Sequence, residues 1–330
     1  MPVLQIILRQ LPGDFPAALL IVTHLAPDGP GLLPAILQGA GPLDVLPAAD
    51  DTLIAAGHVY VAPPDHHLLV DGLNMRLSRG PRENRFRPAI DPLFRTAAAA
   101  FGPRVIGVLL SGGLDDGVLG LCRIKARGGI AVVQEPYDAH KGDLPQRAID
   151  RVDVDFVLPA NSIAETLTQL VHSPAGGGTV TDPNDARTES PDAATRSLQS
   201  GGPGGTPSPY SCPECGGALW ELQEGTLTRF QCHVGHRLSE GSLLSAHADA
   251  VEAALWTALR ALEEQASLHQ RLVVRAQSRG AQALAEISEQ QARDIEARAD
   301  VIRQVLLGPG MERSKAELEG QTSADNSPHA

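Results

Sequence analysis

Short apolar runs that alternate with helix-like segments constrain the fold of this chain more than any other feature. The runs that read as strands are residues 17–24, 57–62, 104–111, 129–134 and 155–158. Helical patterns lie between and after them, most clearly at residues 31–38, 91–100, 117–126 and 163–171. Near-continuous apolar strands separated by helices are what a parallel sheet covered on both faces requires. Residues 1–172 are therefore predicted to form an α/β domain with a doubly wound, mostly parallel sheet.

One pair of strands is predicted to be antiparallel. Apolar residues at 68–70 and 75–77 flank Asp71-Gly72, a dipeptide that readily adopts the positive φ angles of a tight hairpin turn. We expect this hairpin at one edge of the sheet.

The second half of the chain has a different composition. At 330 residues the chain is long enough for about two domains. Residues 173–210 are rich in Gly, Pro, Ser, Thr and Asp, and their small apolar surface cannot offset the entropy lost on ordering, which predicts a disordered linker. Residues 241–308 carry apolar side chains at helical spacing on both sides of a break at 278–280, which predicts a helical hairpin or a short coiled coil for partner binding or self-association. The tail, residues 309–330, is predicted to be disordered.

Three of the four cysteines gather between the linker and the hairpin, in residues 211–240. Cys212 and Cys215 form one closely spaced pair, and Cys232 and His236 form a second. Two such pairs supply the four sulfur and nitrogen ligands that structural Zn²⁺ prefers. His233 competes for the fourth position, but it is adjacent to Cys232. Four protein ligands leave no open coordination position, so we predict a zinc knuckle that holds the fold, and catalysis that needs no cofactor.

The net charge argues against nucleic acid as a partner, and the shortness of the apolar runs argues against insertion into a membrane. With 27 basic and 39 acidic side chains the formal net charge is -12, so the neutralisation of phosphates that supplies most nucleic-acid affinity is absent overall. The apolar run near the start of the chain is much shorter than the ~20 residues of a membrane span.

Four cysteines are too few for a disulfide framework, and Cys122 falls in an apolar helix pattern typical of a core residue. We expect a cytoplasmic, soluble protein that neither inserts into a membrane nor binds nucleic acid.

Side chains that could carry chemistry follow two of the predicted strands. His24 ends the first strand, and Asp115 and Asp116 follow the strand 104–111 in a glycine-rich turn. Active groups of open α/β sheets gather at the carboxyl ends of strands, and a histidine base needs an acid to orient its ring. Each residue alone also has a structural interpretation, as a helix N-cap for the acids and as a hydrogen-bonded residue for the histidine.

Four stretches, residues 17–27, 57–67, 80–94 and 110–117, resemble in order and spacing the catalytic domain of the protein-glutamate methylesterases of bacterial chemotaxis. The resemblance covers about residues 1–160. It implies that His24 is the catalytic histidine, that Asp116 rather than Asp115 is the catalytic acid, and that the backbone near Gly113 donates to the oxyanion. The Cys-x-Val-Gly-His pattern ending at His236 is similar to tails fused to this family, which favours His236 over His233 as the ligand.

One departure from the family pattern concerns the nucleophile. The family places it in a Gly-Ala-Ser-x-Gly-Gly turn before the histidine, and residues 1–23 contain no serine. Residues 3–11 read as the helix that follows that turn. We therefore expect translation to begin upstream, so that the sequence is short at its amino end by the first strand and its serine. Ser111 is the one candidate substitute, and we interpret it as structural.

The resemblance implies a substrate and a mechanism. A serine would attack the methyl ester of a glutamate in a methylated chemoreceptor or similar signalling protein, while His24 takes its proton and Asp116 holds the imidazole. Arg82, Arg85 and Arg87 form a basic loop that either faces an acidic receptor segment or is simply solvated. No receiver-like segment is recognisable. Two alternatives remain open: a catalytically inactive adaptor that binds receptor helices, and an unrelated esterase or amidase on the same fold. His66 and His67 are interpreted as turn residues.

Overall fold

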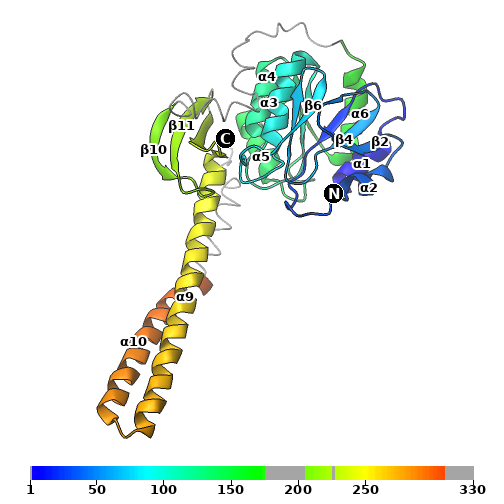
Figure 1. The fold of residues 1–330 in the computed structure, drawn as a ribbon. Coiled ribbons are helices and arrows are strands. Elements are labelled where there is room, and N and C mark those ends of the chain that lie inside the picture. The colour runs from blue at the N-terminus through cyan, green and yellow to red at the C-terminus, as the bar shows by residue number, and fades with distance from the viewer. Residues whose placement is uncertain (1, 175–204, 225–226, 309–330) are drawn as a thin grey trace, which may run out of the picture. The chain divides into compact units, whose positions relative to one another are not determined.

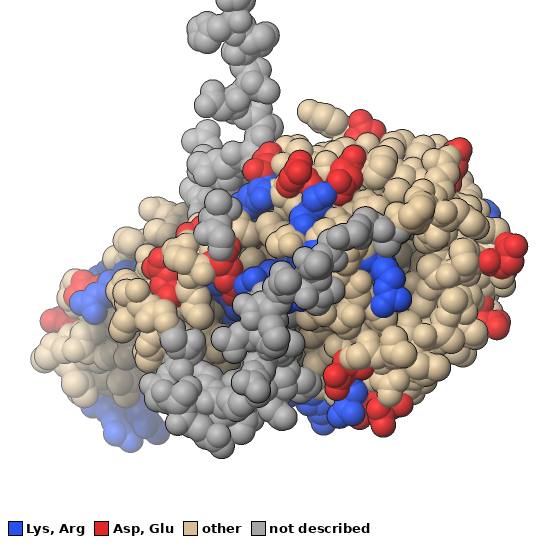
Figure 2. Space-filling view, turned by 90° about the horizontal axis from the view of Figure 1, so that it is seen from above, with Lys and Arg blue, Asp and Glu red and all other residues tan. Residues whose placement is uncertain are grey.

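The computed structural model describes residues 2–174, 205–224 and 227–308. The chain divides into two compact units, residues 1–243 and 244–330. None of the helices in the described ranges combines the length and the apolar character that a membrane span requires. Figure 2 shows acidic and basic side chains interspersed on one face of the described residues.

Two parallel three-stranded sheets form the centre of the first unit (Figure 1). In the first, β1 (Leu19–Ile21) and β2 (Asp44–Pro47) lie on either side of β4 (His58–Val61). In the second, β7 (Ile106–Leu109) and β9 (Phe156–Leu158) lie on either side of β8 (Ile130–Gln134). The helices of this region are α1 (Pro2–Gln10), α2 (Leu33–Gln38), α3 (Ile90–Phe101), α4 (Val118–Ala126), α5 (Asp143–Arg151) and α6 (Ala160–Val171), with a short 3₁₀ turn at Gly102–Arg104. The α/β fold predicted from the sequence is confirmed.

One hydrophobic cluster joins the two parallel sheets. It contains Leu19 and Ile21 of β1 together with Ile106 and Val108 of β7, packed with residues of α1, α2 and α6. Among the described residues β1 pairs with β4 alone and β7 with β8 alone, so one edge of each strand has no ladder partner there. These two strands therefore share a core without sharing hydrogen bonds.

The predicted hairpin forms, but in a sheet of its own. β5 (His67–Asp71) and β6 (Asn74–Ser78) pair antiparallel, with Leu68 opposite Leu77, and β3 (Thr52–Leu53) joins the outer side of β6. Gly72 has φ +58°, the left-handed conformation that the turn requires. Leu68, Val70 and Met75 pack against α3, so this small sheet supports the helix whose first turn enters the site below.

A four-stranded antiparallel sheet, here called the ribbon, ends the first unit. Its strands are β10 (Thr206–Ser211), β11 (Ala218–Glu224), β12 (Leu227–Cys232) and β13 (Arg237–Ser239), in chain order. Leu219, Phe230 and Leu238 form its small core with two of the cysteines. β10 lies inside the segment 173–210 expected to be linker, so the ribbon begins earlier than the knuckle 211–240; residues 175–204 lie outside the described ranges.

Two helices make up the described part of the second unit, with α9 beginning in the first. α9 (Glu240–Ser278) and α10 (Gln282–Leu307) run antiparallel as a hairpin around Gly280, whose φ is +71° (Figure 1). Leu259, Ala299 and Leu306 are buried between them. The predicted tail, residues 309–330, lies outside the described residues.

Candidate functional site

His24 and Asp116 meet at the carboxyl ends of two different strands. His24 follows β1, Asp116 follows β7, and the His24 Nε2 atom lies 2.7 Å from Asp116 Oδ2. The Asp116 side chain is 2% exposed, whereas that of His24 is 28% exposed. A buried acid that holds a partly exposed imidazole leaves the other ring nitrogen, Nδ1, to take up or release a proton.

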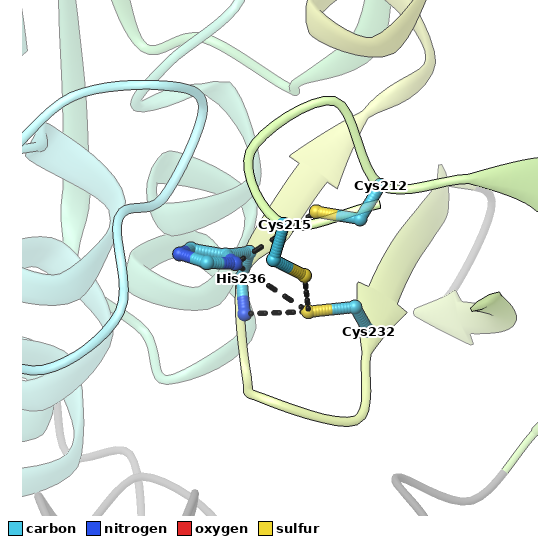
Figure 3. A group of neighbouring side chains, drawn as sticks. All are labelled: Cys212, Cys215, Cys232 and His236. Carbon is cyan, nitrogen blue, oxygen red and sulfur yellow. Dashed lines mark hydrogen bonds between the residues drawn. The ribbon is translucent and has the colours of Figure 1, made fainter. Parts of the chain in front are cut away.

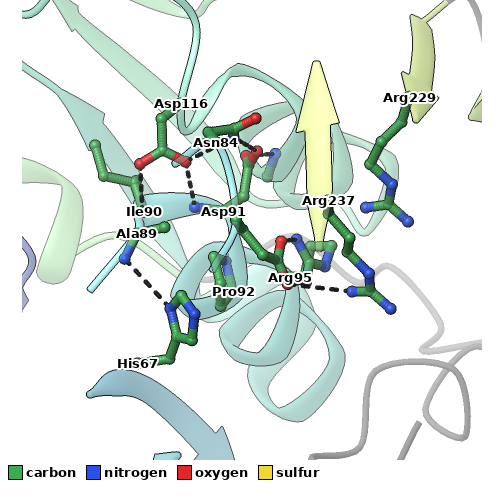
Figure 4. Close-up of polar contacts among 12 residues, drawn as sticks. His67, Asn84, Ala89, Ile90, Asp91, Pro92, Arg95, Asp116, Arg229 and Arg237 are labelled. Carbon is green, nitrogen blue, oxygen red and sulfur yellow. Dashed lines mark hydrogen bonds and ion pairs between the residues drawn. The ribbon is translucent and has the colours of Figure 1, made fainter. Parts of the chain in front are cut away.

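The first turn of α3 and the Asn84 side chain also bind the Asp116 carboxylate (Figure 4). The Ile90 amide donates to Oδ2 at 2.7 Å, the Asp91 amide to Oδ1 at 3.3 Å, and the Asn84 side-chain amide to Oδ1 at 3.0 Å. Burial alone would raise the pKa of Asp116, but these donors and His24 outweigh it and lower the pKa below its usual value. Asp116 is therefore ionised and fixed in orientation.

A second buried acid, Asp91, lies beside Asp116. Its carboxylate accepts the Gly117 and Gly120 amides at 3.1 and 2.7 Å and the Asn84 side-chain amide at 2.9 Å. Burial and the charge of Asp116 raise the pKa of Asp91 to about 8. Asn84 thus donates to both acids through one amide group.

Phe86 covers one face of the histidine ring. The two rings stack with centroids 3.6 Å apart and an interplanar angle of 1°. A pocket of about 290 Å³ opens beside them. It is lined by His24, Leu25, Ala26, Pro27, Arg82, Arg85, Phe86 and Arg87. The structure therefore places all three arginines of the predicted basic loop around the pocket that holds His24.

The three arginines are not equivalent. Arg87 donates to Asp65 Oδ1 from Nε at 2.9 Å and to the Gly80 carbonyl at 2.8 Å. Hydrogen bonds from Arg87 and Arg79 lower the pKa of Asp65 to about 2. Arg82 lies 3.3 Å from Glu214 of the ribbon. Arg87 thus anchors its loop, whereas Arg82 pairs with the ribbon.

Gly113 lies in the loop between β7 and α4, three residues before Asp116. A Cβ atom built at Gly113 would meet no atom within 4 Å, so its Cα borders open space. Ser111 is in the same loop, and its backbone amide donates to the Gln134 side chain at 3.1 Å. Within the described residues, His24 is hydrogen-bonded to Asp116 and to neither Gly113 nor Ser111.

Residues that the sequence analysis did not single out complete the surroundings. Glu83 forms a bidentate pair with Arg95 at 2.8 and 2.9 Å, and both side chains are buried. Arg237 of the ribbon lies 3.3 Å from the same carboxylate. Coulombic attraction and hydrogen bonding from Arg95, with the charge of Arg237, hold the pKa of Glu83 well below its usual range, although burial acts to raise it. Glu83, Asn84 and Phe86 all fall inside the stretch 80–94 that carried the family resemblance.

The ribbon gathers the four predicted metal ligands (Figure 3). The ligand atoms of Cys212, Cys215, Cys232 and His236 all lie within 4.8 Å of one another. The Cys215 and Cys232 sulfurs are 3.7 Å apart, and His236 Nδ1 is 3.5 Å from the Cys232 sulfur. A tetrahedron with zinc-to-sulfur bonds of about 2.3 Å has edges of roughly 3.8 Å, so this donor set fits the ion. His233 is outside the cluster, with its ring near Trp220.

Comparisons with known proteins find matches over the first half of the chain. The CheB methylesterase family matches residues 1–167. A putative protein-glutamate methylesterase/protein-glutamine glutaminase of Leptospira interrogans is 39% identical over 168 residues, which are 51% of this chain and 87% of the relative. A protein-glutamate methylesterase/protein-glutamine glutaminase of Pyrococcus abyssi is 34% identical over 52% of this chain and 48% of the relative, so the match spans about half the length of that protein. The crystal structure of the Thermotoga maritima CheB methylesterase catalytic domain matches with a TM-score of 0.50 and 31% identity, over 52% of this chain and 92% of that one.

Proposed function

The chain belongs to the CheB methylesterase family through residues 1–167, and on that basis we propose that it hydrolyses the methyl esters of glutamate side chains in a chemoreceptor or similar signalling protein. The observation that carries the proposal is the 2.7 Å contact between His24 and the buried, ionised Asp116 at the mouth of a pocket. A histidine oriented by a buried carboxylate is the general base that acyl transfer from an ester needs. The cytoplasmic location expected from the composition stays a prediction.

The proposed reaction has two steps. A serine Oγ attacks the ester carbonyl carbon while His24 takes the serine proton and Asp116 stabilises the imidazolium. The tetrahedral intermediate collapses, His24 returns the proton to the leaving methoxide, and methanol departs. Water then attacks the acyl-enzyme by the same route and releases the glutamate. Backbone donors around Gly113 are proposed to bind the oxyanion, an effect of ~3–4 kcal/mol per donor.

The serine itself is proposed to lie on a strand that precedes Met1. Residues 1–23 contain no serine, and the described hydrogen bond of Ser111 goes from its backbone amide to Gln134. β1 and β7 each have one edge without a ladder partner among the described residues, while their side chains share one cluster. A parallel strand between them would pair with both edges, and its carboxyl end would emerge between His24 and Asp116. That is where a nucleophile has to be.

Methanol release from methylated receptor tests this proposal. We would compare the 330-residue chain with a form extended to the next upstream start codon, and each with its His24→Ala variant. Turnover in the extended form that is lost with His24→Ala is the expected result. Receptor binding without turnover in either form would favour the inactive adaptor. Hydrolysis of small esters with no preference for methylated receptor would favour an unrelated esterase.

We further propose that Cys212, Cys215, Cys232 and His236 hold a structural zinc ion. The support is the closeness of four ligand atoms of the types zinc prefers, in a ribbon whose own core is small. Metal analysis of purified protein should give one zinc per chain. The Cys215→Ala variant should lose it, and the His233→Ala variant, which alters the neighbouring histidine outside the cluster, should retain it.

The basic pocket and the helical hairpin supply two further proposals about partners. Arg82 and Arg85 are proposed to contact acidic residues that flank the methylated glutamate, so charge reversal at either should raise KM with little change in kcat. Self-association is proposed through α9, which exposes Trp256 and Val274, and α10, which exposes Val301. Light scattering on the intact chain would report a dimer.

A further inference from the structure

The edge of the ribbon binds a loop of the methylesterase region as if that loop were another strand. The loop is residues 82–86. The Arg237 amide donates to the Arg82 carbonyl at 3.3 Å, and the Asn84 amide donates to the Arg237 carbonyl at 2.8 Å. These bonds make a parallel bridge between Glu83 and Arg237. β13 therefore fixes the backbone path of the 82–86 loop.

This loop touches both members of the catalytic pair. Asn84 donates to Asp116, and Phe86 stacks on His24. The oxygen of the same Asn84 side chain accepts the Ser239 backbone amide of the ribbon at 3.0 Å. Asn84 is 4% exposed. One buried amide group thus links the ribbon, through its oxygen, to the catalytic acid, through its nitrogen.

The loop adopts a conformation that its own residues do not favour. Asn84 and Arg85 have φ angles of +50° and +74°, in the left-handed region that residues with a Cβ rarely occupy. Consecutive residues of this kind persist where surrounding contacts hold them. Arg95 holds the loop from the α3 side through Glu83, and β13 holds it from the ribbon side. Loss of the ribbon contact would leave the loop anchored at one side only.

A second contact joins the ribbon to the residue before the catalytic acid. Ser239 Oγ donates to Asp115 Oδ1 at 2.5 Å and accepts the Ser242 amide at 3.0 Å, so it caps the first turn of α9. The Asp115 side chain is 2% exposed. The adjacent acids therefore have separate partners: Asp116 binds His24, and Asp115 binds the end of the ribbon.

The metal ligands flank the strand that makes these contacts. β12 ends at Cys232, β13 begins directly after His236, and the Cys232 amide donates to the His236 carbonyl at 3.1 Å. A sheet this small, with a core of six buried residues that include two of the cysteines, depends on its metal for a defined fold. A metal bound at this turn would therefore help to fix the start of β13, which pairs with β12 along its length.

We infer that the metal-loaded ribbon is a positioning module for the catalytic pair: β13 holds the 82–86 loop so that Asn84 stays on Asp116 and Phe86 stays on His24. The inference rests on the proposed methylesterase function for its kinetic consequence. Its structural part, the coupling of the metal site to the loop, can be tested without measuring turnover. Asn84 is accordingly a positioning residue that acts on His24 through Asp116.

Hydrogen exchange on the 330-residue chain tests the structural part. Exchange would be measured in three states of the protein: loaded with zinc, after zinc is removed by a chelator, and after zinc is added back. Chelation should speed exchange in residues 82–86 and 115–118 and leave β8 (Ile130–Gln134) unchanged, and added zinc should reverse the effect. The Cys215→Ala variant should behave as the chelated protein and His233→Ala as the loaded one. Unchanged exchange in residues 82–86 after the ribbon loses zinc would overturn the inference.

Turnover by the extended chain tests the kinetic part. Chelation should lower kcat about tenfold, as for loss of one hydrogen bond to a charged group, with a smaller change in KM. Asn84→Ala should also lower kcat and should reduce the further effect of chelation, because both changes remove the contact of Asn84 with Asp116, while the stacking of Phe86 on His24 is affected by chelation alone. Ser239→Ala, which keeps Asn84, should give a smaller loss. A rise in kcat on chelation would mean that the ribbon blocks the site and would overturn the inference. Absence of turnover in the zinc-loaded chain would refute the proposed function, and the exchange experiment would still decide the coupling.

Discussion

Replacing Asp116 with asparagine changes one oxygen for an NH₂ group and removes the charge, with almost no change in shape. In the native protein both oxygens accept hydrogen bonds: Oδ2 from the Ile90 amide, with His24 beside it, and Oδ1 from Asn84. If the new NH₂ replaces Oδ2, it faces the Ile90 amide and donates to His24, which then carries its proton on Nδ1. That tautomer cannot accept a proton from the nucleophile at Nδ1.

The opposite orientation of the new amide would keep the native tautomer of His24, but it sets the NH₂ against two donors instead of one, so the first orientation is favoured. If the NH₂ replaces Oδ1, it faces the donors of Asn84 and the Asp91 amide. Either way two donors meet in a buried site, which costs ~1–3 kcal/mol of folding free energy. Loss of the correct tautomer lowers kcat by ~10³–10⁴-fold in comparable triads. We therefore expect Asp116→Asn in the extended chain to lose about that much kcat and to unfold at lower urea concentration.

A third measurement on Asp116→Asn, the pKa of Asp91, reports the loss of charge separately from any change in shape. The charge of Asp116 contributes, after burial, to the raised pKa of Asp91. In Asp116→Asn the pKa of Asp91 should fall from about 8, which carboxyl NMR shifts would report. The matched control is Asp115→Asn, whose acid contacts Ser239 instead of His24, and its kcat should fall much less. If Asp116→Asn kept kcat within tenfold of the native value, the assignment of Asp116 as the acid that orients His24 would be refuted.

Three other changes test the surroundings of the site. Glu83→Gln breaks the buried pair with Arg95 and should destabilise the fold by ~3–5 kcal/mol in urea denaturation; a destabilisation below about 1 kcal/mol would contradict a structural role. The folded-state pKa of Glu83 is depressed, so its carboxylate should stabilise the fold fully above its unfolded-state pKa of ~4.3. This stabilisation should decline as pH falls below that value, and Glu83→Gln should remove the pH dependence. For Asp65, whose folded pKa is about 2, stability should decline as pH falls from ~4 toward 2, and Asp65→Asn should flatten thermal melting over that range. Cys215→Ala should melt at a lower temperature than the zinc-loaded native chain, and added zinc should fail to restore the native melting temperature.

The α/β fold was predictable because its central strands are continuous apolar runs. β2 (Asp44–Pro47) escaped prediction, because only Val45 in it is buried and it ends in proline. α5 (Asp143–Arg151) escaped because it is mostly charged and polar, with a proline inside, and it buries Leu144 and Ala148 on one narrow side. In both elements tertiary packing decides the structure over a weak local pattern.

β10 (Thr206–Ser211) reads as linker in the sequence because it contains Pro207 and Pro209. Proline is tolerated at the edge of a sheet, where no ladder hydrogen bond is needed on the outer side, and β10 is the edge strand of the ribbon. The true start of the ribbon thus depends on strand order, which composition does not report.

The sequence pattern placed His24 near Asp115 and Asp116, since all follow strands whose carboxyl ends meet at one edge, and the resemblance to the family selected Asp116, which the structure shows bonded to His24. Asn84 could not be found in this way. It lies in a loop, and its partners, Asp116 and Ser239, are 32 and 155 residues away. Its importance arises from a contact between two parts of the chain that are joined by residues 173–210.

The most direct test of the account is mass spectrometry of methylated receptor after incubation with the zinc-loaded, extended chain. The account predicts conversion of glutamyl methyl esters to glutamates at the receptor sites, abolished in His24→Ala and reduced ~10³–10⁴-fold in Asp116→Asn. Full retention of the esters with the extended chain, or their loss at an equal rate with His24→Ala, would contradict it.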